Sequence, residues 1–342
     1  TFAKYPAIWG TAELRQAIAG WLGRRYPGLA GKVDMEKHIL PLAGSREGLF
    51  YAVFPAKRRK PAESRPAVLI PNPFYHTYAA AAAAAETEAV FVPASRETGF
   101  LPDPDALDPA LLDRTVGLFL ATPANPQGTV ADADYLSAVI GLAREHDFIL
   151  FADECYSEIY TGTPPPGALE VSAERHGDFR NVISFNSLSK RSNLPGLRSG
   201  YCAGDPDFLV AYAGLRNVAG PQLPMPIQHA SARIWSDEAH VEESRAIYRA
   251  KFDLADRLLT GRYGYLRPEG GFFLWLDMSG HGGGEAATKT LWKECGVKVV
   301  PGGYLARDTD DGNPGAEFVR VALVADLATT EHGLRRIVET LQ

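Results

Sequence analysis

Six short apolar runs, separated by stretches with helical periodicity, constrain the fold of this chain more than any other feature of its sequence. The runs are almost unbroken in their hydrophobicity, which is typical of strands covered on both faces. Between them lie helix-like stretches such as residues 133–145, where apolar positions recur with helical period. Alternating strands and helices predict an α/β domain with a mostly parallel sheet. The six runs cover residues 68–70, 89–92, 116–120, 148–151, 181–185 and 200–203.

The pattern changes in the last third of the chain and predicts a second, smaller domain. Residues 238–259 predict one long amphipathic helix, and two strand-like runs follow at 271–276 and 318–323. We therefore expect a large domain in residues 1–235 and a smaller α+β domain in residues 236–342.

The composition argues against several classes of protein. Its 35 Lys and Arg against 41 Asp and Glu give a formal net charge of -6, so we expect no nucleic-acid partner. No apolar run is long enough to span a bilayer, so we expect no membrane partner. The three cysteines, Cys155, Cys202 and Cys295, lack the spacing of a zinc site. They predict unpaired thiols, no metal and a cytoplasmic location.

The segment from Ser187 to Tyr201 carries the strongest chemical signal, because it places Lys190 among small hydroxyl residues. Most lysines lie on the solvated surface, and that is the alternative interpretation here. The setting suits instead a lysine whose free amine reacts with a carbonyl to form a Schiff base. Ser187, Ser189 and Arg198 are suited to hold a phosphate, the arginine by a two-pronged contact.

A reactive lysine beside a phosphate site suggests pyridoxal 5′-phosphate (PLP), which makes further demands on a protein. Its pyridine nitrogen needs a carboxylate, and Asp153 directly follows the run at 148–151. The carboxyl end of a central strand is where open α/β sheets bind ligands, although the same position also suits a helix N-cap. Its phenolate oxygen needs hydrogen-bond donors, for which Tyr156 and Asn125 are candidates; Asn125 lies in a turn-like sequence.

Three further candidates complete this set. Ser45 and Arg46 lie in a turn of small residues that opens a helix, where free backbone N–H groups attract phosphate. Tyr75 offers an aromatic face for the ring, although a core tyrosine is its ordinary interpretation. Arg320 lies within the apolar run at 318–323, and burying it is costly without an anionic partner. The α-carboxylate of an amino acid, bound bidentately, is such a partner.

These motifs, in this order, resemble the fold-type I, class I/II PLP-dependent aminotransferases from Tyr5 to the end of the chain. The resemblance implies an α/β fold with a mostly parallel seven-stranded sheet between helices, plus a smaller α+β domain. It also implies PLP as cofactor and amino-acid and 2-oxo-acid substrates. Because the chain starts at Thr1 rather than Met and enters a helical pattern by Glu13, we expect the N-terminal segment of that family to be absent.

The resemblance also assigns a role to each candidate residue. Lys190, Asp153 and Tyr156 are expected to be catalytic. Tyr5 matches a tyrosine that reaches the phosphate of a neighbouring subunit, which implies a homodimer with shared active sites. The remaining contacts are expected from Asn125 to the phenolate oxygen and the substrate, Tyr75 to the ring, Ser45, Arg46, Ser187, Ser189 and Arg198 to the phosphate, and Arg320 to the substrate α-carboxylate.

A narrower likeness is to bacterial N-succinyldiaminopimelate aminotransferases. It is carried by residues 71–75, 153–160, 187–200 and 313–324, and it implies amino exchange with glutamate and 2-oxoglutarate in lysine and diaminopimelate biosynthesis. A broad aminotransferase for aspartate and similar acids, a PLP-dependent C–S or β-lyase, and a non-enzymatic PLP-binding regulator are the alternatives.

The sequence does not single out the cation that would bind a distal carboxylate of the substrate. Arg191 and Arg216 are the candidates, and the alternative for each is a structural ion pair.

Overall fold

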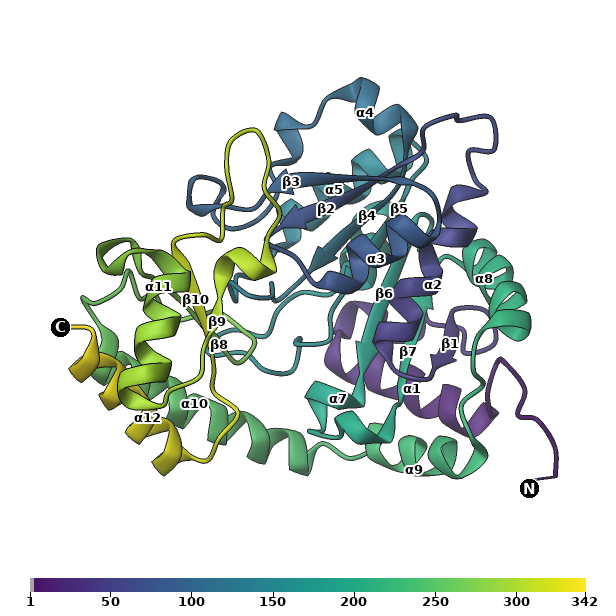
Figure 1. Cartoon of the computed structure of the whole chain (residues 1–342). Coiled ribbons are helices and arrows are strands. Elements are labelled where there is room, and N and C mark those ends of the chain that lie inside the picture. Colours follow the sequence, from purple (N-terminus) through teal and green to yellow (C-terminus); the bar gives the residue numbers. More distant parts are fainter. Residues whose placement is uncertain (1–2) are drawn as a thin grey trace.

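A seven-stranded sheet forms the centre of the larger domain in the computed structural model, which describes residues 3–342 (Figure 1). The strand order is β1-β7-β6-β5-β4-β2-β3. Only β7 runs against the others, because it pairs antiparallel with both β6 and β1. The mostly parallel α/β sheet expected from the sequence is therefore confirmed. The strands are β1 (Ile39–Leu42), β2 (Ala67–Asn72), β3 (Glu88–Pro93), β4 (Thr115–Ala121), β5 (Ile149–Asp153), β6 (Val182–Ser187) and β7 (Gly200–Gly204).

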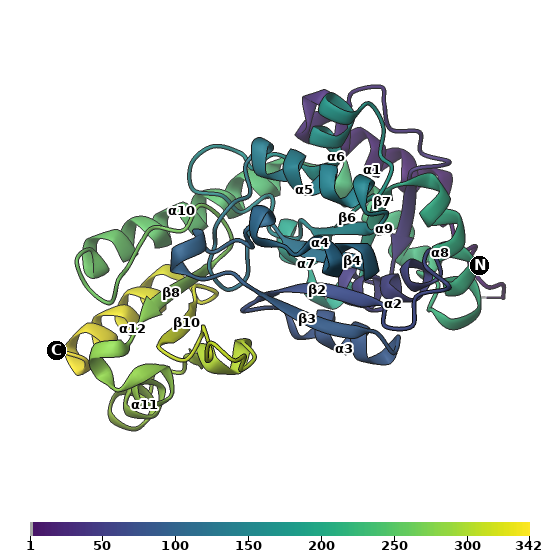
Figure 2. The ribbon, with the colours of Figure 1, turned by 90° about the horizontal axis from the view of Figure 1, so that it is seen from above.

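Helices cover both faces of this sheet, as continuous apolar strands require (Figure 2). Successive residues of a strand point to opposite faces, so Leu69 packs into one core while Val68 and Ile70 pack into the other. The first core lies under α1 (Ala12–Arg25), α5 (Ala133–Glu145), α6 (Ala168–Val171) and α9 (Met225–Trp235). The second lies under α2 (Ser45–Lys57), α3 (His76–Ala84) and α8 (Pro206–Ala219). Two short helices, α4 (Pro109–Arg114) and α7 (Leu188–Arg191), connect strands.

The C-terminal part is built on a three-stranded antiparallel sheet of order β8-β10-β9. The predicted long helix is α10 (Ala239–Leu259), and the two predicted runs coincide to within two residues with β8 (Phe273–Asp277) and β10 (Phe318–Ala322). The other elements are β9 (Val300–Pro301), α11 (Gly283–Thr290) and α12 (Leu327–Thr340). The predicted boundary between residues 235 and 236 falls between α9 and α10, and it stays a prediction. Within residues 3–342, none of the helices has the length and apolar character to cross a membrane.

Three hydrogen bonds connect the end of β2 with the chain that follows β9, and we refer to them as the inter-domain clasp. The buried side chain of Asn72 accepts from the N–H of Arg307 (2.9 Å) and donates to its carbonyl (2.9 Å). The N–H of Phe74 donates to the carbonyl of Leu305 (2.8 Å). The clasp fixes a loop of the small domain against the carboxyl edge of the large sheet.

Candidate active site

A cavity of about 680 Å³ opens at the carboxyl edge of the large sheet and is bounded on its other side by β9 and β10. Tyr5 alone among the predicted site residues lies elsewhere: its side chain is 93% exposed near the start of the chain. The other predicted residues all line the cavity, namely Ser45, Arg46, Tyr75, Asn125, Asp153, Tyr156, Ser187, Ser189, Lys190, Arg198 and Arg320.

Asp153 is the last residue of β5, and its carboxylate is buried at the floor of the cavity. The hydroxyl of Tyr78 donates to its Oδ2 atom (2.7 Å), and the N–H of Cys155 donates to its Oδ1 atom (3.3 Å). Burial raises the pKa of Asp153, while the hydrogen bonds from Cys155 and Tyr78 act in the opposite direction. A buried carboxylate with so few donors gains most from a cationic partner, and a protonated pyridine nitrogen is such a partner.

Lys190 projects into the cavity from the short helix α7, whose N-cap is Ser187. Its Nζ atom lies 4.8 Å from the ring centroid of Phe272 and 5.7 Å from that of Tyr156. Burial is the main cause that lowers the pKa of Lys190, and the positive charge of Arg320 acts in the same direction. A larger share of this amine is therefore unprotonated at neutral pH than for an exposed lysine, as a nucleophile requires.

The start of α2 and the turn after α7 form a cradle of donors at one end of the cavity. Gly44 is the N-cap of α2 and has a φ of +90°, and a Cβ atom there would overlap the guanidinium of Arg198. The Arg198 guanidinium contacts the carbonyls of Pro195 (3.0 Å) and Ala43 (3.4 Å), and no carboxylate pairs with it in the described chain. Free N–H groups at a helix start together with an unpaired guanidinium fit a phosphate group.

The side chains of Ser45, Ser187 and Ser189 add hydroxyl groups to this cradle. The hydroxyl of Ser187 caps α7 by accepting from the N–H of Ser189 (3.1 Å), and it donates to the Ser189 hydroxyl (2.9 Å). The thiol of Cys155 donates to the Ser45 hydroxyl (3.1 Å).

Aromatic side chains form the walls of the cavity between its floor and the phosphate cradle. Tyr75 is half-buried, accepts a hydrogen bond from Nε of Arg46 (2.6 Å) and meets Tyr78 edge-on at 5.6 Å. Tyr156 is buried and packs edge-on against Phe273. An aromatic face and a phenol thus lie on the same cavity as the buried carboxylate.

Arg320 extends from β10 across the cavity toward the large domain. Its guanidinium lies 4.3 Å from the ring centroid of Phe273 and donates to Oδ1 of Asn125 (3.0 Å). Its Nε atom is buried without a hydrogen-bond partner, and burial lowers the pKa of Arg320. No carboxylate within the described residues pairs with this guanidinium, so it is free to bind a carboxylate that enters the cavity.

Neither candidate for the distal carboxylate of the substrate lines the cavity. Arg191 is fully buried and pairs with Glu238 (2.9 Å). Arg216 is also fully buried and pairs with Glu47 (2.8 Å). The alternative of a structural ion pair is therefore correct for both.

Several cavity residues had not been predicted, among them Phe74, His76, Tyr78 and Cys155. Tyr78 lies three residues after Tyr75 at the start of α3, a spacing that places both side chains on one face of a helix. That spacing was the available signal for Tyr78. His76, Phe74 and Cys155 carried no comparable signal.

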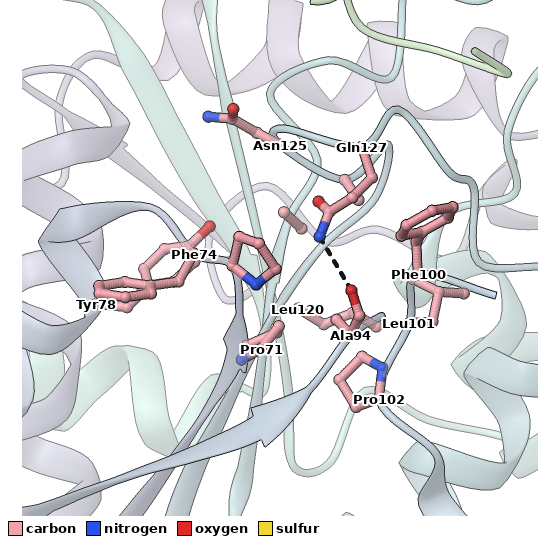
Figure 3. A pocket seen from close by; sticks show the side chains of 13 residues that line it. Pro71, Phe74, Tyr78, Ala94, Phe100, Leu101, Pro102, Leu120, Asn125 and Gln127 are labelled. Atoms are coloured by element: carbon pink, nitrogen blue, oxygen red, sulfur yellow. Dashed lines mark hydrogen bonds between the residues drawn. The ribbon is translucent and has the colours of Figure 1, made fainter. Parts of the chain in front are cut away.

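A second, smaller cavity lies behind the wall that Phe74 and Tyr78 form (Figure 3). Its volume of about 20 Å³ is enough for one water molecule. Nε2 of Gln127 donates there to the carbonyl of Ala94 (3.3 Å), as the dashed line in Figure 3 marks. Asn125 lines both cavities, so the buried Gln127 supports the same turn that presents Asn125 to the larger one.

The cavity provides the groups that PLP requires, namely an amine, a carboxylate, an aromatic face and a phosphate cradle. It offers nothing comparable for a metal, since residues 3–342 contain no group of three or more His, Cys, Asp or Glu side chains that could hold one.

Comparison with known proteins gives matches along nearly the whole chain. The sequence profile of the family described as aminotransferase class I and II matches residues 1–341. An LL-diaminopimelate aminotransferase of Syntrophobacter fumaroxidans is 30% identical, over 98% of this chain and 82% of its own length. The crystal structure of an aminotransferase from Neisseria meningitidis is 39% identical, with a TM-score of 0.93, over 99% of this chain and 85% of its own. That of the aminotransferase AspB from Helicobacter pylori is 35% identical, with a TM-score of 0.89, over 98% and 85%.

Proposed function

The chain belongs to the class I and II aminotransferases, as its sequence resemblance indicated, and we propose a substrate for it within that family. It is a PLP-dependent aminotransferase that acts on amino acids and 2-oxo acids. We propose that it exchanges an amino group between N-succinyl-LL-2,6-diaminopimelate and 2-oxoglutarate, in lysine and diaminopimelate biosynthesis. The similarity to an LL-diaminopimelate aminotransferase supports a substrate with the diaminopimelate skeleton. The charge of the cavity lining supports a succinyl group on that substrate.

The charge of the cavity lining is the observation on which the choice of substrate depends. Asp153 is the one acidic side chain among the lining residues, and its role is toward the cofactor. Free LL-diaminopimelate would bring a second ammonium group, for which the lining provides no carboxylate. Succinylation turns that amine into an uncharged amide and adds a carboxylate. The lining is otherwise cationic, through Arg46, Lys190, Arg198 and Arg320.

The chain's own residues then have the following proposed tasks. Bound PLP supplies an aldehyde that takes up the amino group and a ring that accepts electrons from the substrate α-carbon. The Lys190 amine removes the proton from the α-carbon and delivers it to the neighbouring carbon of the cofactor, acting as base and then as acid. Asp153 holds a proton on the pyridine nitrogen, and Arg320 fixes the α-carboxylate.

The contacts that hold the cofactor follow from the same positions. We propose that Tyr75 packs on its ring and that Tyr156 and Asn125 donate to its phenolate oxygen, Asn125 also touching the substrate. Its phosphate is held by the cradle of Ser45, Arg46, Ser187, Ser189 and Arg198. Because Arg46 already donates to the Tyr75 hydroxyl, its contribution to the phosphate comes mainly from the backbone.

An absorbance experiment tests this function. The PLP-loaded protein is mixed with glutamate, and its visible absorption should fall as that of pyridoxamine phosphate rises. Addition of the N-succinylated 2-amino-6-oxo acid should then restore the first spectrum. Used as amino donor, N-succinyl-LL-diaminopimelate should have a kcat/KM at least about tenfold above that of LL-diaminopimelate, the usual value of one charge-assisted contact.

Other outcomes would contradict the proposal in identifiable ways. Equal or higher kcat/KM with free LL-diaminopimelate would transfer the assignment to that substrate. Preference for aspartate would favour the broad dicarboxylic aminotransferase. Release of a β-substituent without any 2-oxo acid would favour the β-lyase.

The homodimer with shared active sites and the cytoplasmic location remain proposals. The exposure of Tyr5 agrees with a role across a subunit boundary. Light scattering of the purified protein should give the mass of a dimer. Tyr5→Phe should then weaken PLP binding, and unchanged PLP affinity in that variant would remove Tyr5 from the site.

A further inference from the structure

Arg307 lies at the mouth of the cavity with its backbone fixed and its side chain uncommitted. The inter-domain clasp holds both its N–H and its carbonyl on the side chain of Asn72. Its guanidinium carbon lies 5.9 Å from the ring centroid of Phe74, which lines the cavity. The Arg307 side chain is exposed and pairs with no carboxylate of the described chain. The adjacent acid, Asp308, is occupied by a hydrogen bond from Asn313 (2.9 Å).

His76 connects this arginine with the interior of the cavity. Its ring lies edge-on to Phe74 at 5.8 Å, and the residue itself lines the cavity. Burial lowers the pKa of His76, and the charges of Arg307 and Arg320 lower it further. The imidazole therefore lies in the electrostatic field of both guanidinium groups.

The positions of the two arginines suggest a path for an extended substrate. Arg320 is half-buried and lines the cavity, whereas Arg307 is exposed and stands beyond Phe74. A short acid such as glutamate, held at Arg320, stays within the cavity lining. A long substrate held at the same point extends along Phe74 and His76 toward Arg307.

We propose that Arg307 is a specificity-determining residue that binds the far carboxylate of a long dicarboxylic or acyl-amino-acid substrate. The proposal rests on the proposed function in taking Arg320 as the site of the near carboxylate. It gives the cavity the distal cation that neither Arg191 nor Arg216 supplies. The clasp through Asn72 gives this arginine a fixed place at the mouth although its side chain is exposed.

Calorimetric binding of unreactive acids to the PLP-loaded protein tests the subsite without any turnover. Glutarate, pimelate and azelate place two carboxylates at increasing separation, and heptanoate and nonanoate match the longer two but lack the second carboxylate. We expect the wild type to bind a longer diacid more tightly than glutarate and more tightly than its monoacid. Arg307→Gln should remove that gain, about tenfold or more for a bidentate contact. Arg307→Lys should keep part of it.

Arg262→Gln is the matched control, because Arg262 is an exposed arginine of the small domain outside the cavity lining. It should bind every acid as the wild type does. A parallel kinetic test uses Nε-succinyl-lysine and Nε-acetyl-lysine as amino donors, of which only the first carries a distal carboxylate. Arg307→Gln should raise KM for the succinyl compound about tenfold and leave KM for acetyl-lysine and for glutamate unchanged.

Two results would overturn the subsite. One is a length dependence among the diacids that Arg307→Gln leaves intact. The other is an equal loss for monoacids and diacids in that variant, which would mean that Arg307 shapes the cavity rather than binding a carboxylate. Failure of the proposed function is separate, because it shows as a wild-type spectrum that glutamate and the succinylated donor leave unchanged, whereas the calorimetric series still reports on Arg307.

Discussion

At the scale of single residues, the chemistry depends most directly on Lys190. Lys190 is half-buried, its amine lies against aromatic rings, and it has no carboxylate at ion-pair distance within the described chain. Because no carboxylate pairs with the Lys190 amine, no ion pair stabilises its protonated form, and the amine stays available as a nucleophile.

Lys190→Ala should abolish transamination, with a loss of at least about 10³-fold in kcat, because no other amine among the described residues lines the cavity. PLP should also be retained poorly, which equilibrium dialysis measures independently of activity. Near-normal turnover in this variant would show that another group moves the proton.

Tyr78→Phe tests the support of the buried carboxylate. The change removes the hydrogen bond to Asp153 but keeps the ring, which stacks on Phe119 at 4.3 Å. PLP binding should weaken by about 1.5–3 kcal/mol, the usual contribution of a hydrogen bond to a charged group. Burial already raises the pKa of Asp153, and losing this donor raises it further, so the acid limb of the kcat profile should move to higher pH.

The measurement for Tyr78→Phe is a pH profile of kcat together with a PLP titration. Phe119→Leu, which disturbs the stack but leaves the hydrogen bond, is the matched control and should leave the acid limb in place. An acid limb at the same pH in Tyr78→Phe and the wild type would exclude Tyr78 from tuning the carboxylate.

At this scale, sequence reasoning identified cavity residues that are unusual in their local sequence and missed residues whose contacts are with distant parts of the chain. Lys190, Asp153 and Arg320 were found because a lysine among serines, an acid after a strand and an arginine within a strand are locally unusual. Tyr78 and Arg307 are not unusual in their local sequence. Their partners, Asp153 and Asn72, are 75 and 235 positions away.

At the scale of elements, the short helix α7 acts as a joint between the site and the long helix α10. It presents Lys190 to the cavity and Arg191 to the opposite side. The Arg191 guanidinium donates to the carbonyls of Ile234 (3.1 Å) and Asp237 (3.0 Å), at the junction of α9 and α10, and to Glu238 (2.9 Å). The reactive lysine is thus one residue from the contact that fixes the start of the long helix.

Arg191→Met should lower the free energy of unfolding by about 2–4 kcal/mol, because it removes the hydrogen bonds that this buried guanidinium donates to the carbonyls of Ile234 and Asp237 and to Glu238. Urea denaturation measures the change. Glu238→Gln should cost less than about 1 kcal/mol, because the Glu238 side chain is 40% exposed and its ion pair is screened. Equal losses in the two variants would mean that the ion pair, rather than the carbonyl contacts, holds the joint.

The two strands that sequence reasoning missed share a physical cause. β1 has only four residues with Pro41 inside it, and β9 has two. Neither carries enough residues to show a period, and both are strands only because longer neighbours pair with them. Longer elements such as α5 and α10 were predicted almost to the residue, because their own helical periodicity defines them.

At the scale of the whole molecule, stability should depend on pH through a carboxyl that is buried next to the site. Glu154 accepts hydrogen bonds from the N–H of Ala168 (2.6 Å) and the hydroxyl of Ser184 (2.7 Å) and is 2% exposed. Burial raises the pKa of Glu154 from 4.5 to about 7. The folded state therefore keeps a proton between these pH values that the unfolded chain releases.

The contribution of Glu154 to stability should be present in full below pH 4.5 and lost as the pH rises through about 7. Compared with Glu154→Gln, which cannot titrate, the wild type should lose about 2–3 kcal/mol of unfolding free energy between pH 5 and pH 8. The exposed Glu145→Gln is the control and should follow the wild type at every pH. A wild-type slope identical to that of Glu154→Gln would mean that this carboxyl is already ionised at pH 5.

The two faces of the cavity belong to separable lengths of chain. Lys190, Asp153 and Arg198, which are proposed to hold the cofactor, come from the large domain, whereas Arg307 and Arg320 come from a stretch of some twenty residues in the small one. Changes within that stretch can therefore alter which substrates are accepted and leave these cofactor contacts untouched. Enzymes built in this way can evolve new substrate preferences while they keep the same reaction. An engineer who seeks a new substrate would vary this stretch of some twenty residues first.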